Sequence, residues 1–140
     1  MTVTIAETRN IAACHALRRE VFIEEQAVPE AEEIDDLDDM ALHLIATQGD
    51  TPVGTARIVV QGDTAKIGRV CVLKSQRGTG LGAAIMREAL RVAARQPGVT
   101  RAKLGAQMHA LTFYEKLGFT AFGPVYDDAG IDHRDMERPL

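Results

Sequence analysis

The chain has 140 residues, a net charge of −4 at pH 7 and an apolar fraction of 46%, which predicts one globular domain over residues 1–140 with a real core. No run of about 18 apolar residues occurs, and the N-terminus lacks the features of a signal peptide, so we expect a cytoplasmic protein without a membrane partner. No basic stripe with interleaved aromatics is present, so we also expect no nucleic-acid partner.

The cysteines and the acidic residues add two expectations. Cys14 and Cys71 lie in separate apolar segments and are expected to be reduced core residues rather than a disulfide or a metal pair. Residues 30–39 contain seven acidic residues and no basic one. We interpret this segment as a solvated loop; the alternative is that it attracts a cationic acceptor.

The first half of the chain predicts a strand and a helix, followed by three more strands. Residues 3–6 alternate in polarity and predict a short strand, after which Thr8 or Asn10 can cap a helix that runs to about Glu25. The acidic segment at 27–40 is predicted to be a loop. Apolar runs at 41–47, 53–60 and 65–73 are separated by turn sequences and predict an antiparallel meander.

The second half predicts helices alternating with strands. A glycine-rich turn leads into a helix over about 80–96, which Pro97 and Gly98 end. A strand at 101–106, a short helix at 110–117 capped by Gly118, and strands at 119–122 and 131–138 follow. The long helix connects two strands as a crossover. The expected fold class is therefore α/β, with a mixed sheet flanked by helices.

The glycine-rich turn, Gln76 to Ala83, is predicted to bind a phosphate group. Its glycines allow close approach of the backbone, and the free amides of the first helical turn attract an anion. A Walker-type loop needs a lysine and a hydroxyl residue after the last glycine, where this chain has Ala83 and Ala84. A dinucleotide fingerprint needs an acidic residue about 20 positions later, and the region 96–103 has none.

Two motifs carry a resemblance to a known family. Arg77-x-x-Gly80-x-Gly82 resembles the acyl-coenzyme A pyrophosphate loop of the Gcn5-related N-acetyltransferases, the GNAT superfamily. The segment 110–119, with Phe113 and Tyr114 before a glycine, resembles the segment after the fifth strand of that family. Similarity to the ElaA/YjcF-like branch extends over residues 3–138, and it includes 17–26, Asp38, His43, Ala106-Gln107 and 129–136.

The chain departs from the pattern of that branch at two positions. Gly105 stands where the branch often has histidine, and Asp132 stands where it often has proline before the histidine. Gly105 removes a polar group near the expected site, and Asp132 adds a charge beside His133.

The resemblance implies acetyl-coenzyme A as co-substrate. The backbone of Val70, Cys71 and Val72 would pair with the pantetheine arm, and the Val70 N–H would polarise the thioester carbonyl. The further coenzyme-binding residues that the resemblance implies are Arg77, Gly78, Thr79, Gly80, Leu81, Gly82, Ala83, Gln107 and Phe113. No His and Cys cluster suggests zinc, so we expect no metal.

Tyr114 and His133 are the expected catalytic residues of an N-acetyltransferase that acts on a small-molecule amine or an exposed amino group. A phenol with a pKa of about 10 can donate a proton to the leaving thiolate, and an imidazole can accept one from the amine. His43 is the alternative base to His133, and Glu25 and Glu20 are further candidates for this role. Glu25, His43 and Arg69 are candidates for contact with the acceptor. The family habit implies a homodimer. The alternative function is a non-catalytic sensor that binds acyl-coenzyme A.

Overall fold

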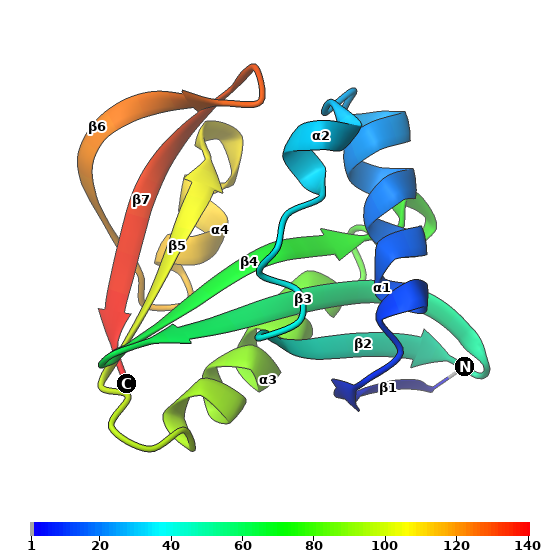
Figure 1. Ribbon diagram of the computed structural model, residues 1–140, viewed down its shortest axis with the longest axis horizontal. Helices are drawn as coiled ribbons and strands as arrows, with labels where there is room; N and C mark the ends of the chain where they lie inside the picture. The colour runs from blue at the N-terminus through cyan, green and yellow to red at the C-terminus, as the bar shows by residue number, and fades with distance from the viewer. Residues whose placement is uncertain (1) are drawn as a thin grey trace.

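The computed structural model describes residues 2–140 and forms a seven-stranded sheet in the order β1-β2-β3-β4-β5-β7-β6 (Figure 1). Its strands are β1 (Val3–Thr8), β2 (Leu42–Gln48), β3 (Thr51–Gln61), β4 (Thr64–Val72), β5 (Arg101–Gln107), β6 (Thr120–Asp128) and β7 (Ile131–Pro139). β4 and β5 pair in parallel, whereas the other neighbours are antiparallel. The predicted mixed sheet is confirmed.

The predicted helices occur in the predicted order, but the second half of the first one is a π-helix, and a short helix that was not predicted follows it. They are α1 (Ile11–Arg18), the π-helix η1 (Arg19–Glu25), α2 (Glu30–Glu33), α3 (Leu81–Ala94) and α4 (Leu111–Glu115), with 3-10 turns η2 (Lys74–Gln76) and η3 (Met108–Ala110). Asn10 caps α1, because its Oδ1 accepts a bond from the Ala13 N–H at 3.2 Å. No helix in the described part of the chain has the length and apolar character that crossing a membrane requires.

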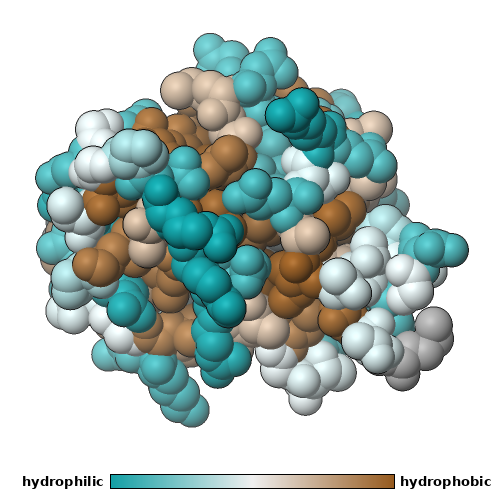
Figure 2. Space-filling model, turned by 90° about the horizontal axis from the view of Figure 1, so that it is seen from below, coloured by the Kyte–Doolittle hydropathy of each residue, from teal (hydrophilic) through white to brown (hydrophobic). Residues whose placement is uncertain are grey.

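Helices cover both faces of the central strands and create two apolar clusters. α3 buries Ile85, Met86 and Ala89 in the larger cluster. Leu17 of α1 and Val21 of η1, which together form the first helix, make a smaller cluster with Cys71. β3 is buried over most of its length because it lies between the two layers. The outer side of α3 presents exposed arginines, and hydrophilic and hydrophobic areas share the face seen in Figure 2.

A β-bulge in β4 changes which side chains face each cluster. Thr55 of β3 opposes Cys71 and Arg57 opposes Gly68, so Arg69 and Val70 have no partner in this register. Ile67 belongs to the α3 cluster, and beyond the bulge Cys71 belongs to the α1 cluster, because one extra residue inverts the alternation of the strand. Arg69 adopts the left-handed conformation there, with φ of 50°.

Two parts of the chain differ from the sequence-based expectation. The acidic segment contains α2, and Glu33 and Asp38 within it are buried rather than solvated. β6 continues through Gly123 and Pro124, which were expected to lie in a loop, because a register shift between Phe122 and Tyr126 absorbs the irregular residues. Cys14 and Cys71 are free and buried, as predicted.

Candidate active site

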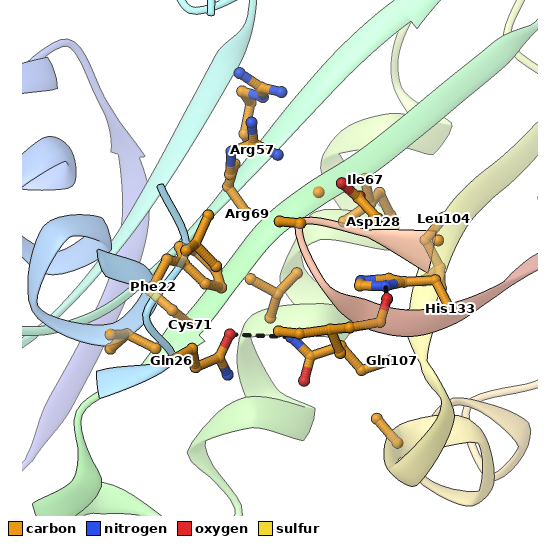
Figure 3. Close-up of a pocket in the computed structure, with 18 of the residues that line it drawn as sticks. Phe22, Gln26, Arg57, Ile67, Arg69, Cys71, Leu104, Gln107, Asp128 and His133 are labelled. Carbon is orange, nitrogen blue, oxygen red and sulfur yellow. Dashed lines mark hydrogen bonds between the residues drawn. The ribbon is translucent and has the colours of Figure 1, made fainter. Parts of the chain in front are cut away.

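The site lies in a gap between β4 and β5. The two strands pair only from Thr64 to Lys66 with Arg101 to Lys103, and beyond this point they diverge (Figure 1). A cavity of about 660 Å³ occupies the gap and is lined by residues of the first helix, β4, β5, α4 and the β6–β7 hairpin (Figure 3). This volume is in the range of small-molecule sites, about 300–1,000 Å³.

One end of the cavity lies at the N-terminus of α3. Gly80 holds the preceding position in the left-handed conformation, with φ of 84°, and no side chain caps the helix. The first amides of a helix have no intrahelical acceptor, so they are available to an anion. Gly82 and Phe113 line the cavity beside them. The other predicted residues of the turn and first helical positions are not lining residues: Gly78, Thr79, Gly80, Leu81 and Ala83.

Arg77 connects this turn to the end of the first helix. Its Nε and Nη2 donate to the Val72 carbonyl at 3.2 and 3.1 Å, and Nη2 also donates to Glu25 Oε1 at 2.8 Å. The fork geometry of the guanidinium matches the Glu25 carboxylate. The hydrogen bond from Arg77 holds the pKa of Glu25 below its usual value. Both side chains line the cavity, and their ion pair forms part of its wall.

Tyr114 of α4 is half-buried beside the cavity and packs against the larger apolar cluster. Burial raises the pKa of Tyr114 to about 12. The ring makes edge contacts with Phe113 and Phe119, with centroids 5.0 and 6.1 Å apart. These contacts fix the ring, and its position in the lining lets a bound molecule reach the phenol. A phenol with a raised pKa stays protonated at neutral pH and can act as a hydrogen-bond donor.

His133 of β7 presents one defined nitrogen to the cavity. Its Nδ1 lies 2.7 Å from the carbonyl oxygen of Ile131. Because a carbonyl only accepts, Nδ1 carries the proton, and Nε2 of the neutral ring keeps its lone pair. The residue is 9% exposed and lines the cavity. This arrangement is suitable for accepting a proton from a bound molecule.

A hydrogen bond between two glutamines crosses the gap. Gln107 Nε2 donates to Gln26 Oε1 at 3.0 Å, and Figure 3 shows the bond running across the cavity. Gln26 is the C-cap residue that follows η1, and Gln107 ends β5 directly opposite His133 in the β5–β7 register. The first helix is therefore tied to the strand that lies beside the candidate base.

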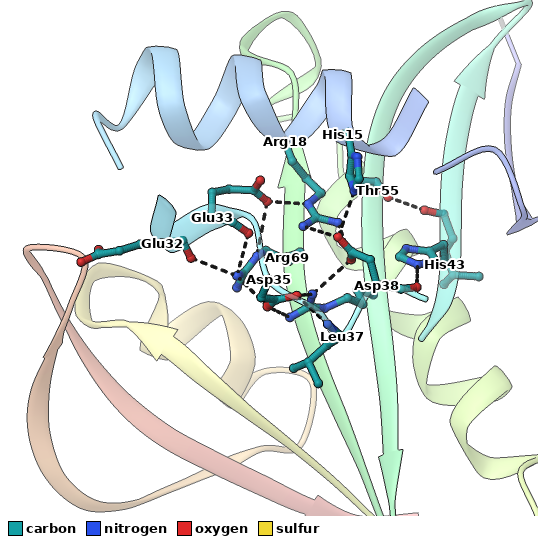
Figure 4. Close-up of polar contacts among 12 residues, drawn as sticks. His15, Arg18, Glu32, Glu33, Asp35, Leu37, Asp38, His43, Thr55 and Arg69 are labelled. Atoms are coloured by element: carbon teal, nitrogen blue, oxygen red, sulfur yellow. Dashed lines mark hydrogen bonds and ion pairs between the residues drawn. The ribbon is translucent and has the colours of Figure 1, made fainter. Parts of the chain in front are cut away.

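Arginines and acids form a second polar group (Figure 4), and its members Glu33, Arg57 and Arg69 also line the cavity. Buried Arg18 donates to Glu33 at 2.6 Å and to Asp38 at 2.8 Å, and Arg57 donates to Asp35 at 2.7 Å. Burial opposes ionisation of Asp38, but hydrogen bonds from Arg18, His15 and Arg57 hold its pKa well below the usual value. The acidic segment is thus fastened to the sheet by its own ion pairs.

Arg69 reaches the same group from the bulge of β4. Its Nη2 donates to the Glu33 carbonyl at 3.0 Å and to Asp35 Oδ2 at 3.2 Å. Its Nε is the one buried side-chain nitrogen or oxygen within residues 2–140 that lacks a hydrogen-bond partner, and it lies 3.4 Å from Glu33 Oε1. Burial and the nearby Arg57 lower the pKa of Arg69.

The structure brings most of the predicted site residues together. The cavity lining includes Glu25, Arg69, Val70, Cys71, Val72, Arg77, Gly82, Gln107, Phe113, Tyr114 and His133. His43 lies outside the lining; it is buried, and its Nε2 lies 2.9 Å from the Asp38 carbonyl. Across residues 2–140, no three His, Cys, Asp or Glu side chains gather where they could hold a metal ion.

Several lining residues were not named as site candidates from the sequence, and Gln26 and Tyr126 are among the polar ones. Gln26 follows a predicted helix end, which gives no signal of a partner 81 residues away. Tyr126 is one of only two tyrosines in the chain, but it follows a segment that was expected to be a loop.

Comparison with known proteins agrees with this architecture. Residues 6–140 match the acetyltransferase (GNAT) domain family. The chain is 41% identical over 121 residues to the Bacillus subtilis (strain 168) protein named uncharacterized N-acetyltransferase YjcF, covering 86% of each chain. Among solved structures, an acyl-CoA N-acyltransferase from Pseudomonas aeruginosa is 32% identical, with a TM-score of 0.86 and 98% of each chain covered. Escherichia coli ElaA is 29% identical with a TM-score of 0.88, over 98% of this chain and 99% of its own.

The fold, the splayed strands and the family match together define an acetyltransferase-type protein: the chain belongs to the GNAT family. Within the family it is placed in the ElaA/YjcF-like branch, as its sequence motifs predicted.

Proposed function

We propose that the protein is an acetyl-coenzyme A-dependent N-acetyltransferase that acts on a primary amine of a small molecule or on an exposed amino group. The observation that carries the proposal is the single cavity between β4 and β5, which joins the free N-terminus of α3 to Tyr114 and His133. The similarity to the Pseudomonas aeruginosa protein, which is described as an acyl-CoA N-acyltransferase, supports the same donor class.

The coenzyme would lie along the gap. The amides of the 78–83 turn are suited to the pyrophosphate because they begin a helix without a side-chain cap. Val70 lies in the bulge without a partner on β3, so we assign its N–H to the thioester carbonyl. Val72 and Cys71 continue the same edge beside the cavity, and Gln107 is placed to bond the pantetheine amides.

Transfer would then proceed by direct attack. The amine nitrogen forms a bond to the thioester carbonyl carbon, and the carbon–sulfur bond breaks. His133 Nε2 takes the proton from the amine, and the Tyr114 hydroxyl gives its proton to the departing thiolate. The tautomer set by the Ile131 carbonyl and the protonated state of Tyr114 support these assignments.

We also propose that residues 1–140 form one N-acetyltransferase domain and that it works in the cytoplasm as a homodimer. The match over residues 6–140 supports the domain assignment. The two free, buried thiols fit a reducing compartment. Glu25 and Arg69 line the cavity and are the polar side chains that we propose to contact the acceptor.

The experiment combines binding and turnover. Coenzyme A at about 100 times its Kd should stabilise the protein by about 2.7 kcal/mol, measured by thermal unfolding. Release of coenzyme A from acetyl-coenzyme A, followed across a panel of amines, should identify turnover. Stabilisation without turnover on any amine would favour a non-catalytic acyl-coenzyme A sensor, and absence of both would reject the proposed function.

A further inference from the structure

Gly105 and Tyr126 fit each other closely at the side of the cavity. A Cβ atom added to Gly105 would lie 2.5 Å from the Tyr126 hydroxyl, a distance that real structures do not tolerate. The next nearest atoms, Tyr126 Cζ and Asp135 Oδ1, would both be at 3.8 Å, which is ordinary contact. The missing side chain at position 105 therefore makes room for one atom, the phenol oxygen.

That oxygen is held in place by a hydrogen bond. The Tyr126 hydroxyl donates to Asp135 Oδ1 at 2.8 Å, and Asp135 is directly opposite Gly105 in the β5–β7 register. Burial and then the bond to Asp135 raise the pKa of Tyr126 well above its ordinary value. The hydroxyl is thus a fixed donor.

The ring of Tyr126 packs against the candidate base. Tyr126 and His133 are opposite each other in the β6–β7 register, and their rings are stacked, with centroids 5.9 Å apart and planes 24° from parallel. On its other edge His133 donates from Nδ1 to Ile131. The imidazole is therefore held by a stack on its face and a hydrogen bond at its edge, which leaves Nε2 for the cavity.

We propose that Gly105 and Tyr126 act as a pair of positioning residues for His133. The empty position at 105 admits the hydroxyl, the bond to Asp135 fixes the phenol, and the phenol ring holds the imidazole in the orientation that directs Nε2 to the acceptor amine. The catalytic part of this inference rests on the proposed function. It also gives a physical reason for glycine at position 105: a Cβ atom there would displace the Tyr126 hydroxyl.

The test is a double-mutant cycle between Gly105→Ala and Tyr126→Phe. Gly105→Ala alone should displace the phenol and lower kcat by about 10- to 100-fold with the KM for acetyl-coenzyme A little changed, because small misplacements of reacting groups are costly. Tyr126→Phe keeps the ring but removes the clashing oxygen. In that background Gly105→Ala should change kcat by less than about two-fold, since the cause of the coupling is gone.

A second readout does not depend on activity. An imidazole that loses the stack with Tyr126 can turn away from the Ile131 carbonyl that sets its tautomer. The nitrogen-15 shifts of His133 should therefore report the Nδ1–H tautomer in the unaltered protein, a mixture of tautomers in Gly105→Ala, and the single tautomer again in the double variant. Gly68→Ala is the matched control, because it also lines the cavity from a strand and its added Cβ meets nothing within 4 Å. It should leave the tautomer unchanged.

The outcomes separate this inference from the proposed function. If Gly105→Ala shifts neither kcat nor the tautomer, or lowers kcat equally with tyrosine and with phenylalanine at position 126, the positioning role is wrong. If the unaltered protein acetylates no amine, the proposed function fails, while the tautomer measurement still decides whether the pair orients His133.

Discussion

The surroundings of Tyr114 keep its hydroxyl protonated for the step in which the thiolate would leave. The phenol lies among apolar side chains, and burial raises its pKa to about 12. A phenol with this pKa keeps its proton at neutral pH, so the hydroxyl is present as a donor when the carbon–sulfur bond breaks. Because the thiol of coenzyme A has an ordinary pKa of about 8.5, the high phenol pKa at the same time opposes complete transfer of that proton. The same burial removes competing water, which strengthens a hydrogen bond to the developing thiolate.

We expect Tyr114→Phe to lower kcat by about 10²- to 10⁴-fold, the usual size of a general-acid effect. The affinity for coenzyme A should be nearly unchanged, because the ring and its contacts with Phe113 and Phe119 remain. Steady-state kinetics and calorimetric titration measure the two effects. Since the pKa of Tyr114 is about 12, the rate should also show no loss from this group as the pH rises to about 10. A rate unchanged by the substitution would remove Tyr114 from the mechanism.

Among the elements, the acidic segment at residues 30–39 has a structural role on the side of the sheet that α1 covers. Three arginines from α1, β3 and β4 neutralise Glu33, Asp35 and Asp38. Removing one partner of a buried ion pair leaves the other charge uncompensated, which costs more than the pair itself contributes. The segment therefore depends on Asp38, which contacts Arg18, Arg57 and His15.

We expect Asp38→Asn to lower the free energy of unfolding by about 3–5 kcal/mol at neutral pH, as measured by urea denaturation. The pKa of Asp38 is lower in the folded state than in the unfolded state. Its contribution to stability is therefore complete above the unfolded pKa of about 3.9, and it is lost as the pH falls toward the folded value. The variant should accordingly lose less stability on acidification than the unaltered protein.

The control is Asp39→Asn, since Asp39 is exposed in the same segment and forms no ion pair with the residues that the structure describes. It should change stability by no more than about 0.5 kcal/mol. Equal losses in the two variants would show that the ion-pair group does not hold the segment.

The bond between Gln26 and Gln107 joins two elements across the space that the pantetheine arm is proposed to use. If the arm must displace this bond, Gln26→Leu should tighten binding of coenzyme A by up to about five-fold, since a hydrogen bond contributes about 1 kcal/mol. Binding of adenosine 3′,5′-bisphosphate, which lacks the arm, should be unchanged. Calorimetric titration measures both affinities.

Gln48→Leu supplies the matched control, because it breaks another glutamine pair, Gln76 to Gln48 at 3.1 Å, away from the cavity lining. It should leave the ratio of the two affinities as it is in the unaltered protein. Weaker binding of coenzyme A by Gln26→Leu would show instead that Gln26 holds the arm.

The sequence was informative where the signal is local. The order of strands and helices, the cap at Asn10 and the glycine turn before α3 follow from periodicity and from residue types with known backbone preferences. The bulge at Arg69 and the burial of Asp38 could not be predicted in this way. Both depend on contacts between residues that are 19 to 34 positions apart, and neither leaves a local pattern.

For the same reason the site was predicted in part. Tyr114 and Arg77 lie in compact motifs that resemble those of a family. The Tyr126 hydroxyl bonds Asp135 and occupies the space that Gly105 leaves open. These three residues are separated in the sequence and form no motif there. His43 has a residue type that is suited to catalysis, but its buried bond to a backbone carbonyl places it outside the cavity lining.

On the scale of the whole molecule, the sheet consists of two parts joined at one end. β1 to β4 form one part and β5 to β7 the other, and the parallel pairing at residues 64–66 and 101–103 is where the ladder continues between them. The remaining edges of β4 and β5 face the cavity without a ladder partner. Backbone groups in this position exchange readily with solvent unless a ligand covers them.

We therefore expect bound coenzyme A to slow amide hydrogen exchange on both sides of the gap, at residues 70–72 and 105–107, as well as in the 78–83 turn. Adenosine 3′,5′-bisphosphate at the same saturation should protect only the turn, because it lacks the arm that would lie between the strands. Hydrogen-exchange mass spectrometry on overlapping peptides measures the difference. Protection of β4 and β5 by both ligands alike would mean that the gap closes by a rearrangement of the two parts of the sheet rather than by the arm filling it.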